Sequence, residues 1–186
     1  TAGELFLKNN IDQVSKEKND QYFINLLNKE IIKIASLKKL SVDKFGKEAI
    51  NIFNSRKEDY YDQYIYSLLR TKNKKLIFEL YYQIEANETS INQLSKKYSS
   101  GAEKSKLGII GPVNLKEVHS EIAKILQFSS DSIINEPIEI NNEWFLIQRE
   151  TIISAIYNDH YKNKICMELL NKELEKEYFN LVNPNT

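Results

Sequence analysis

Patterns typical of long amphipathic helices lie at both ends of the 186-residue chain and enclose a middle segment of a different kind. Apolar residues recur every three or four positions from about residue 20 to residue 40, and again over residues 156–181. The middle holds short strand-like runs, and one loop, residues 99–112, contains three of the five glycines. This order indicates an α+β fold in which helices from both ends accompany a small sheet from the middle.

The region after the first helix offers one clear start signal and one ambiguous run. Ser41 is a candidate N-cap for a second helix, and Gly46 is a weak point inside that helix. The aromatic and β-branched residues that follow Asp59 favour a strand over residues 64–69. If that run is helical instead, the chain is an all-helical interaction protein, so the two alternatives stay open at this point.

The rest of the middle segment alternates helices and strands. Helical spacing predicts helices over residues 76–85, 90–98 and 115–126, with the glycine-containing loop before the last of them. Two short strands fit residues 137–140 and 144–148, and Asn141 and Asn142 are suited to the turn between them. We therefore expect the sheet to be antiparallel and small.

Composition excludes several classes of function. The 26 basic and 26 acidic side chains cancel, so a dedicated nucleic-acid binder is not expected. One Cys and two His provide neither a disulfide nor a zinc site, and we expect no metal and no cofactor. No stretch approaches the roughly 20 apolar residues of a membrane span. The compartment stays open: cytoplasmic without an upstream signal segment, periplasmic with one.

Three segments of the middle region resemble the parvulin peptidyl-prolyl isomerases. Leu94-Ser-Lys-Lys-Tyr-Ser99 is similar to the end of a family helix, Leu107-Gly-Ile-Ile-Gly111 to the family's glycine-rich segment, and residues 136–150 to its closing hairpin. The segments occur in the family's order and cover, with the first strand, about half of the chain. The resemblance implies a small antiparallel sheet covered by helices.

The flanking helices extend the resemblance. SurA-type and PrsA-type foldases build a helical chaperone module from segments on both sides of a parvulin domain, and PpiC-type proteins of cyanobacteria are similar in size and in several local motifs. The resemblance implies an N-terminal helical segment at residues 1–57, a parvulin-like domain at 58–150 and a C-terminal helix at 151–186 that packs on the first segment. By charge, residues 1–57 hold 11 basic and 7 acidic side chains, and residues 58–150 hold 11 and 14.

The resemblance also implies a peptide-binding groove, although the family's usual polar residues are replaced. Ser67 and Trp144 stand where a His is expected on the first and last strands, and Gly101 stands where a Cys or Asp is expected, so no catalytic residue is assigned. Strand alternation puts Trp144 and Leu146 on one face, and the analogy makes that face the peptide side. The expected peptide-binding residues are Ser67, Leu69, Ile110, Leu115, His119, Ile122 and Trp144.

Two functions follow from the resemblance. The first is a parvulin-type peptidyl-prolyl cis–trans isomerase and foldase of weak activity, which acts on unfolded, secreted or proline-containing polypeptides. The second is a non-catalytic holdase that keeps the fold and binds peptides without isomerising them. The apolar groove permits the first, whereas the residues found at the three polar positions favour the second. The oligomeric state is not predicted.

Overall fold

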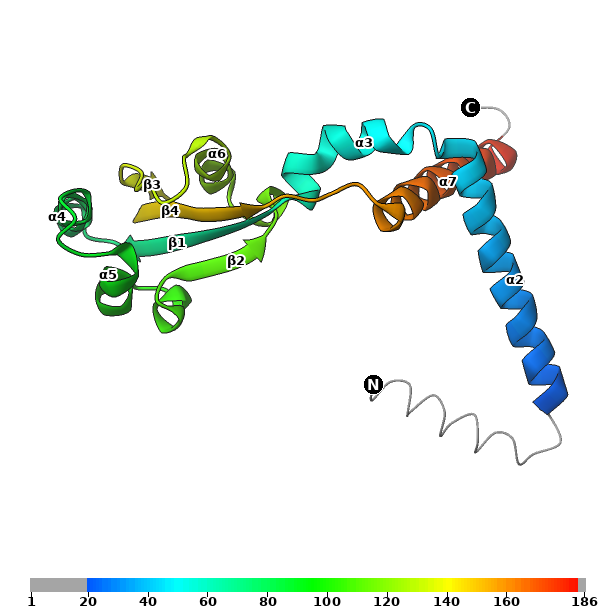
Figure 1. Ribbon diagram of the computed structural model, residues 1–186, viewed down its shortest axis with the longest axis horizontal. Coiled ribbons are helices and arrows are strands. Elements are labelled where there is room, and N and C mark those ends of the chain that lie inside the picture. The colour runs from blue at the N-terminus through cyan, green and yellow to red at the C-terminus, as the bar shows by residue number, and fades with distance from the viewer. Residues whose placement is uncertain (1–19, 184–186) are drawn as a thin grey trace. The chain divides into compact units, whose positions relative to one another are not determined.

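The computed structural model describes residues 20–183, with side chains from Ile24 onward, and the chain divides into two units. One unit consists of the chain up to Ile52 together with the chain from Tyr157, and the other is Phe53–Ile156. Figure 1 shows the order of the elements along the chain. The ends of the predicted outer segments, residues 1–19 and 184–186, lie outside the described residues.

The first unit is helical. Its main elements are α2 (Asp20–Phe45) and α7 (Asp159–Val182), which pack against each other, and the start of α3 (Ala49–Arg56) belongs to it as well. Lys44 of α2 and Glu173 of α7 form a salt bridge with an Nζ–Oε2 distance of 2.5 Å. Cys166 of α7 is fully buried, as a small apolar residue would be. Helices from the two ends of the chain therefore form one layer.

Ser41 does not begin a helix, and that prediction is wrong. The helix α2 continues through Ser41 to Phe45, and the Ser41 hydroxyl donates a hydrogen bond to the carbonyl of Lys38, 2.8 Å away. A serine inside a helix satisfies its hydroxyl in this way when it is buried. The break comes five residues later, at the turn that contains Gly46.

The second unit is built on a four-stranded antiparallel sheet in the order β2-β1-β4-β3. Its strands are β1 (Gln63–Thr71), β2 (Ile109–Val113), β3 (Ile138–Ile140) and β4 (Glu143–Ile153). The helices are α4 (Lys74–Glu85), α5 (Ile91–Tyr98) and α6 (Ser120–Phe128), with shorter turns η1 (Lys57–Tyr61), η2 (Ala102–Lys106) and η3 (Leu115–Glu117). The predicted α+β class is confirmed, and the all-helical alternative is excluded because residues 63–71 are a strand.

Each face of the sheet carries its own core. On one face, Leu69 and Leu146 pack with apolar residues of α4 and α5, which are Ile77, Leu80, Ile84, Ile91 and Leu94. On the other face, Leu68 and Ile147 pack with η3 and α6 through Leu115, Ile122 and Leu126. Successive residues of β1 and β4 therefore enter different cores, as strand alternation requires.

Several elements and boundaries differ from the predictions. The strand β2 lies inside the segment expected to be a loop, because Gly111 and Pro112 are residues typical of loops and uncommon in strands. The predicted helix over residues 115–126 is interrupted at Val118 and His119, so that η3 and α6 are separate. The strand β4 runs to Ile153, and the two units divide after Ile52 and Ile156, a few residues from the expected boundaries after residues 57 and 150.

Hydropathy gives one further result for the described part of the chain. None of its helices combines the length and the apolar character that crossing a bilayer requires.

The core around α6 predicts a matched pair of substitutions. Leu126 is fully buried, so Leu126→Ala should lower the free energy of unfolding by about 2–5 kcal/mol. Phe128, two residues further on, is 81% exposed, and Phe128→Ala should change the free energy of unfolding by less than about 0.5 kcal/mol. Urea denaturation followed by circular dichroism measures both. Equal losses from the two variants would contradict the placement of α6.

Candidate functional site

A hollow of about 350 Å³ opens on the face of the sheet that carries α6. Its apolar lining comes from all four strands and from α6: Leu68, Ile110, Ile122, Ile140 and Phe145. Its polar lining consists of Arg70, Glu103, His119, Asn141 and Glu143. An apolar floor with a few polar groups at the rim is the usual composition of a ligand site, and the volume lies in the usual range.

The polar side of the hollow centres on an ion pair. Arg70 of β1 donates a hydrogen bond from Nε to Glu103 Oε1 at 3.1 Å, and the Ser99 hydroxyl donates to the same carboxylate oxygen. Glu103 is only 7% exposed, so this pairing is what allows its charge to be buried. The second carboxylate, that of Glu143, lies farther away, with 3.8 Å between Oε2 and Arg70 Nη1.

Two glycines allow the short helix η2 to bring Glu103 to the sheet. The Gly108 amide donates to the carbonyl of Glu103 at 2.9 Å, and the Gly108 carbonyl accepts from the Leu68 amide at 2.8 Å. Gly108 has a φ of +79°, and a Cβ there would stand 2.6 Å from the carbonyl oxygen of Leu68. At Gly101 a Cβ would collide with the Arg70 guanidinium, so this glycine leaves room for the ion pair.

Tyr66 lies on the same face of β1, one alternation before Leu68. It is 3% exposed and packs in the core beneath the hollow. Burial, together with the negative charge of Glu103, raises the pKa of Tyr66 to about 12. The phenol is therefore neutral at physiological pH, and its O–H stays a hydrogen-bond donor.

His119 has a fixed orientation at the rim because it caps α6. Its Nδ1 accepts a hydrogen bond from the Glu121 amide at 3.3 Å, in the position usually taken by Ser, Thr or Asp. An imidazole that accepts at Nδ1 carries its hydrogen at Nε2. His119 therefore offers an N–H donor to whatever occupies the hollow.

The structure brings together some of the residues predicted to form the groove. Ile110, His119 and Ile122 line the hollow, and Leu115 is buried in the core that supports it. The other three, Ser67, Leu69 and Trp144, face the opposite side of the sheet. Peptide binding by Ile110, Leu115, His119 and Ile122 stays a prediction, and these four residues lie in the hollow or in the core that supports it.

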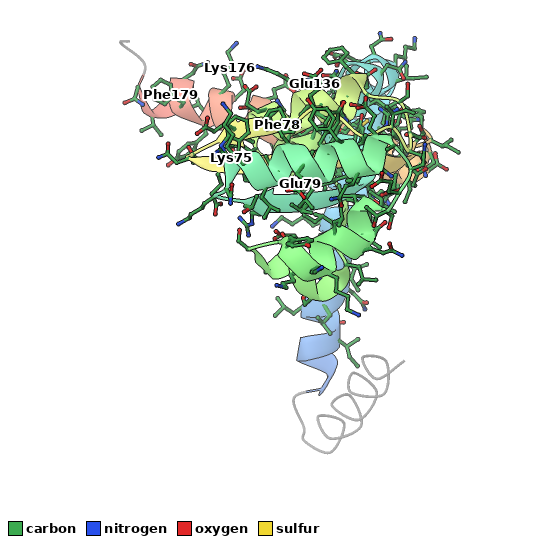
Figure 2. All side chains as sticks on the ribbon, turned by 90° about the vertical axis from the view of Figure 1, so that its left-hand side faces the viewer. Lys75, Phe78, Glu79, Glu136, Lys176 and Phe179 are labelled. Carbon is green, nitrogen blue, oxygen red and sulfur yellow. The ribbon has the colours of Figure 1, made fainter. Side chains whose placement is uncertain are left out.

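Trp144 lies on the face of the sheet opposite the hollow. Its ring packs on Phe78 of α4 with a centroid distance of 5.6 Å, and the Lys74 ammonium lies 4.8 Å from the ring centre. Figure 2 shows Phe78 on α4, together with Lys75 and Glu79 of the same helix. The hollow is on the other face, where Phe145 points. Trp144 therefore does not line this hollow, and the side of the sheet that binds peptide stays a prediction.

Ser67 and Leu69 belong to the same opposite face. The Ser67 hydroxyl donates to Glu150 Oε1 at 2.5 Å and accepts from Asn92 Nδ2 at 2.8 Å, and the residue is fully buried. Leu69 is fully buried against α4 and α5. Both residues hold the helices to the sheet, and neither lines the hollow.

Seven residues that line the hollow were not predicted from the sequence: Leu68, Arg70, Glu103, Ile140, Asn141, Glu143 and Phe145. Four of them lie on β1 and β4, one position from predicted residues, because strand alternation defines two faces but does not identify the one that carries the hollow. Ile140 and Asn141 lie at the turn between β3 and β4. Glu103 lies in a loop segment where no periodic pattern applies. Its signal is a lone acidic residue between two glycines, Gly101 and Gly108.

Metal chemistry has no support in the described part of the chain. Over residues 20–183, no three His, Cys, Asp or Glu side chains are grouped so that they could hold an ion. What the hollow offers is an apolar floor, neutral hydrogen-bond donors and a paired arginine.

The sheet order, the helices on its two faces and the hollow beside α6 together define a parvulin-type domain. Residues 67–151 match the family model described as Rotamase, PPIC-type PPIASE domain. This part of the chain is therefore a PpiC-type rotamase domain, as the sequence predicted. The sequence matches none of the curated proteins.

Solved structures extend the similarity to the flanking helices. The peptidylprolyl isomerase PrsA from Bacillus anthracis is 17% identical with a TM-score of 0.51, and the match covers 88% of this chain and 79% of that one. The foldase protein PrsA from Streptococcus pneumoniae is 17% identical with a TM-score of 0.51, over 89% and 68% of the two chains. At this identity the likeness shows a shared fold, and the predicted PrsA-like architecture is confirmed. The closer likeness to cyanobacterial proteins stays a prediction.

Tyr66 predicts a specific loss of stability at high pH. An unfolded tyrosine ionises near pH 10, whereas folded Tyr66 ionises near pH 12. The folded state therefore keeps the proton that the unfolded state loses, and stability falls as pH rises from about 10 to about 12, by about 2–3 kcal/mol. Tyr66→Phe should reduce the fall in stability when denaturation midpoints are compared between pH 9 and 11; part of it stays because the pKa of Tyr64 is raised as well. Identical slopes in both proteins would contradict the assignment.

A substitution at His119 can separate its role as the N-cap of α6 from a role in ligand binding. His119→Ser keeps a side-chain oxygen for the N-cap of α6 but removes the N–H donor, so the melting temperature should change little. If the donor contacts a peptide, the affinity for a proline-containing peptide should fall about threefold to tenfold, as expected for one lost hydrogen bond. Fluorescence titration with a labelled peptide measures this loss. Unchanged affinity in a folded variant would exclude a contact from Nε2.

Proposed function

We propose that the protein is a parvulin-type peptidyl-prolyl cis–trans isomerase and foldase, and that the prolyl ring of an unfolded polypeptide occupies the hollow beside α6. The observation that carries the proposal is the composition of that hollow. Its floor is formed by apolar side chains from β1, β2, β3, β4 and α6, and its rim holds Arg70 and the N–H of His119.

The reaction needs no bond cleavage. Rotation about an X–Pro bond crosses a barrier of about 18–20 kcal/mol, because the amide loses its conjugation as it twists. The twisted state has less charge separation than the planar amide, so an apolar surface that excludes water favours it. Leu68, Ile122 and Phe145 supply such a surface.

The polar groups of the rim orient the peptide. The N–H of His119 and the guanidinium of Arg70 can donate to carbonyl oxygens on either side of the proline, and this holds one part of the chain while the other turns. Each gain of about 1.4 kcal/mol in the transition state raises the rate tenfold. The family usually has His, Cys or Asp at the positions of Ser67, Trp144 and Gly101. Those residues are not required for the hydrogen bonds described here, so their replacement leaves this contribution in place.

A second function, that of a holdase, has its own observation. The helix α2 exposes a series of large apolar side chains, among them Ile31 at 61%, Ile32 at 64% and Ile34 at 62%. Exposed apolar surface of this kind binds unfolded chains. We infer that the helical unit retains polypeptides while the PpiC-type domain acts on their prolines, which combines the two predicted functions in one molecule. Secreted clients stay part of the proposal.

Two adjacent residues of β2 test the isomerase. Ile110 lines the hollow, and Ile110→Ala should lower kcat/KM toward a proline tetrapeptide about fivefold to tenfold, because apolar contact with the prolyl ring is lost. Its neighbour Ile109 is 44% exposed and does not line the hollow, and Ile109→Ala serves as the matched control. A protease-coupled assay gives both values.

The outcomes separate the two functions. A lower kcat/KM in the Ile110 variant, with an unchanged kcat/KM in the Ile109 variant, supports the proposed site. A parent protein that does not accelerate isomerisation, but suppresses aggregation of an unfolded client, would leave the holdase as the function.

A further inference from the structure

The charged groups around the hollow do not balance. Its lining contains one arginine, Arg70, and two carboxylates, Glu103 and Glu143. His119 accepts a hydrogen bond at Nδ1 and can donate one through Nε2. The lining therefore carries one net negative charge.

The two carboxylates have different surroundings. Glu103 is buried, with its side chain 4% exposed, and it receives hydrogen bonds from Arg70 and Ser99. The Glu143 side chain is 27% exposed, and its carboxylate is 3.8 Å from Arg70, beyond hydrogen-bond distance. Arg70 is thus neutralised mainly by Glu103, and Glu143 keeps the capacity to pair with a cation from a ligand.

The backbone holds Glu143 at the edge of the hollow. It is the first residue of β4 and follows a tight turn at Asn141 and Asn142, whose φ angles are 52° and 64°. Positive φ at both central positions is typical of the turn that joins two adjacent strands directly. Ile140 and Phe145, on either side of this turn, line the apolar part of the hollow. A residue next to a bound proline is therefore within reach of the Glu143 carboxylate.

We infer that Glu143 is a specificity-determining residue, which makes the site prefer prolines that are flanked by Lys or Arg and disfavour prolines flanked by Asp or Glu. The inference rests on the proposed function, since it assigns a substrate class to the same hollow. A basic flanking residue gains a partner in Glu143. An acidic one meets an arginine that Glu103 already neutralises and is repelled by the net negative charge.

Peptides of the form Gly-X-Pro-X-Gly test this, with Lys, Gln or Glu at both X positions. Exchange NMR spectroscopy measures the cis–trans rate directly and needs no protease. The parent protein should accelerate the Lys peptide about fivefold more than the Glu peptide at low salt, which is the effect of one partly exposed charge pair of about 1 kcal/mol. The ratio should shrink in 0.5 M salt because screening shortens the reach of the charge.

Four variants assign the preference to one side chain. Glu143→Gln should bring the Lys-to-Glu ratio to within about twofold, and Glu143→Lys should invert it. Glu139 lies on the same hairpin, is exposed and does not line the hollow, so Glu139→Gln should keep the parent ratio. Glu143→Asp, which retains the charge, should preserve the direction of the preference.

The inference and the proposed function fail in different ways. If the parent accelerates all three peptides equally, or if Glu143→Gln keeps the parent ratio, the inference is overturned and the isomerase stands. If the parent accelerates none of the peptides, the proposed function is overturned together with the inference.

Discussion

The second unit depends on the position of β1, which is hydrogen-bonded along both edges and covered on both faces. β2 pairs with one edge and β4 with the other, while α4 and α5 pack on one face and η3 and α6 on the opposite one. Because neighbouring residues of β1 enter different cores, Leu69 holds the helical layer and Leu68 forms part of the hollow. A register shift by one residue would exchange these roles.

The same strand fixes the electrostatics of the site. The Leu68 amide binds the carbonyl of Gly108, and Arg70, two residues further along β1, binds Glu103 of η2. The loop after α5 is therefore attached to β1 through both its backbone and a side chain. The consequence is a site whose arginine is paired with a buried carboxylate and whose floor is apolar. Such a site can change the shape and surroundings of an amide, which is all that isomerisation requires.

The sequence predicted the order of most elements, because helical spacing and the alternation in β1 and β4 are strong local signals. It did not reveal β2, where Gly111 and Pro112 give a loop-like composition to a strand at the sheet edge. It also could not decide which face of β1 carries the hollow. Leu68 and Leu69 are both buried and apolar, so local hydropathy does not distinguish them. The sequence therefore predicts Trp144 as a groove residue, whereas Phe145 is the residue that lines the hollow. The role of Glu103 in the site depends on its contact with Arg70, which lies 33 positions earlier in the chain, so no local sequence pattern could predict it.

The face of the sheet that binds peptide is the central claim, and methyl NMR spectroscopy tests it most directly. With isoleucine methyl groups labelled, titration of a proline-containing peptide should shift Ile110, Ile122 and Ile140, which line the hollow. The signals of Ile77, Ile84 and Ile91, which lie in the core of the other face, should stay in place. Shifts confined to this second group, accompanied by a change in the Trp144 indole signal, would contradict the account.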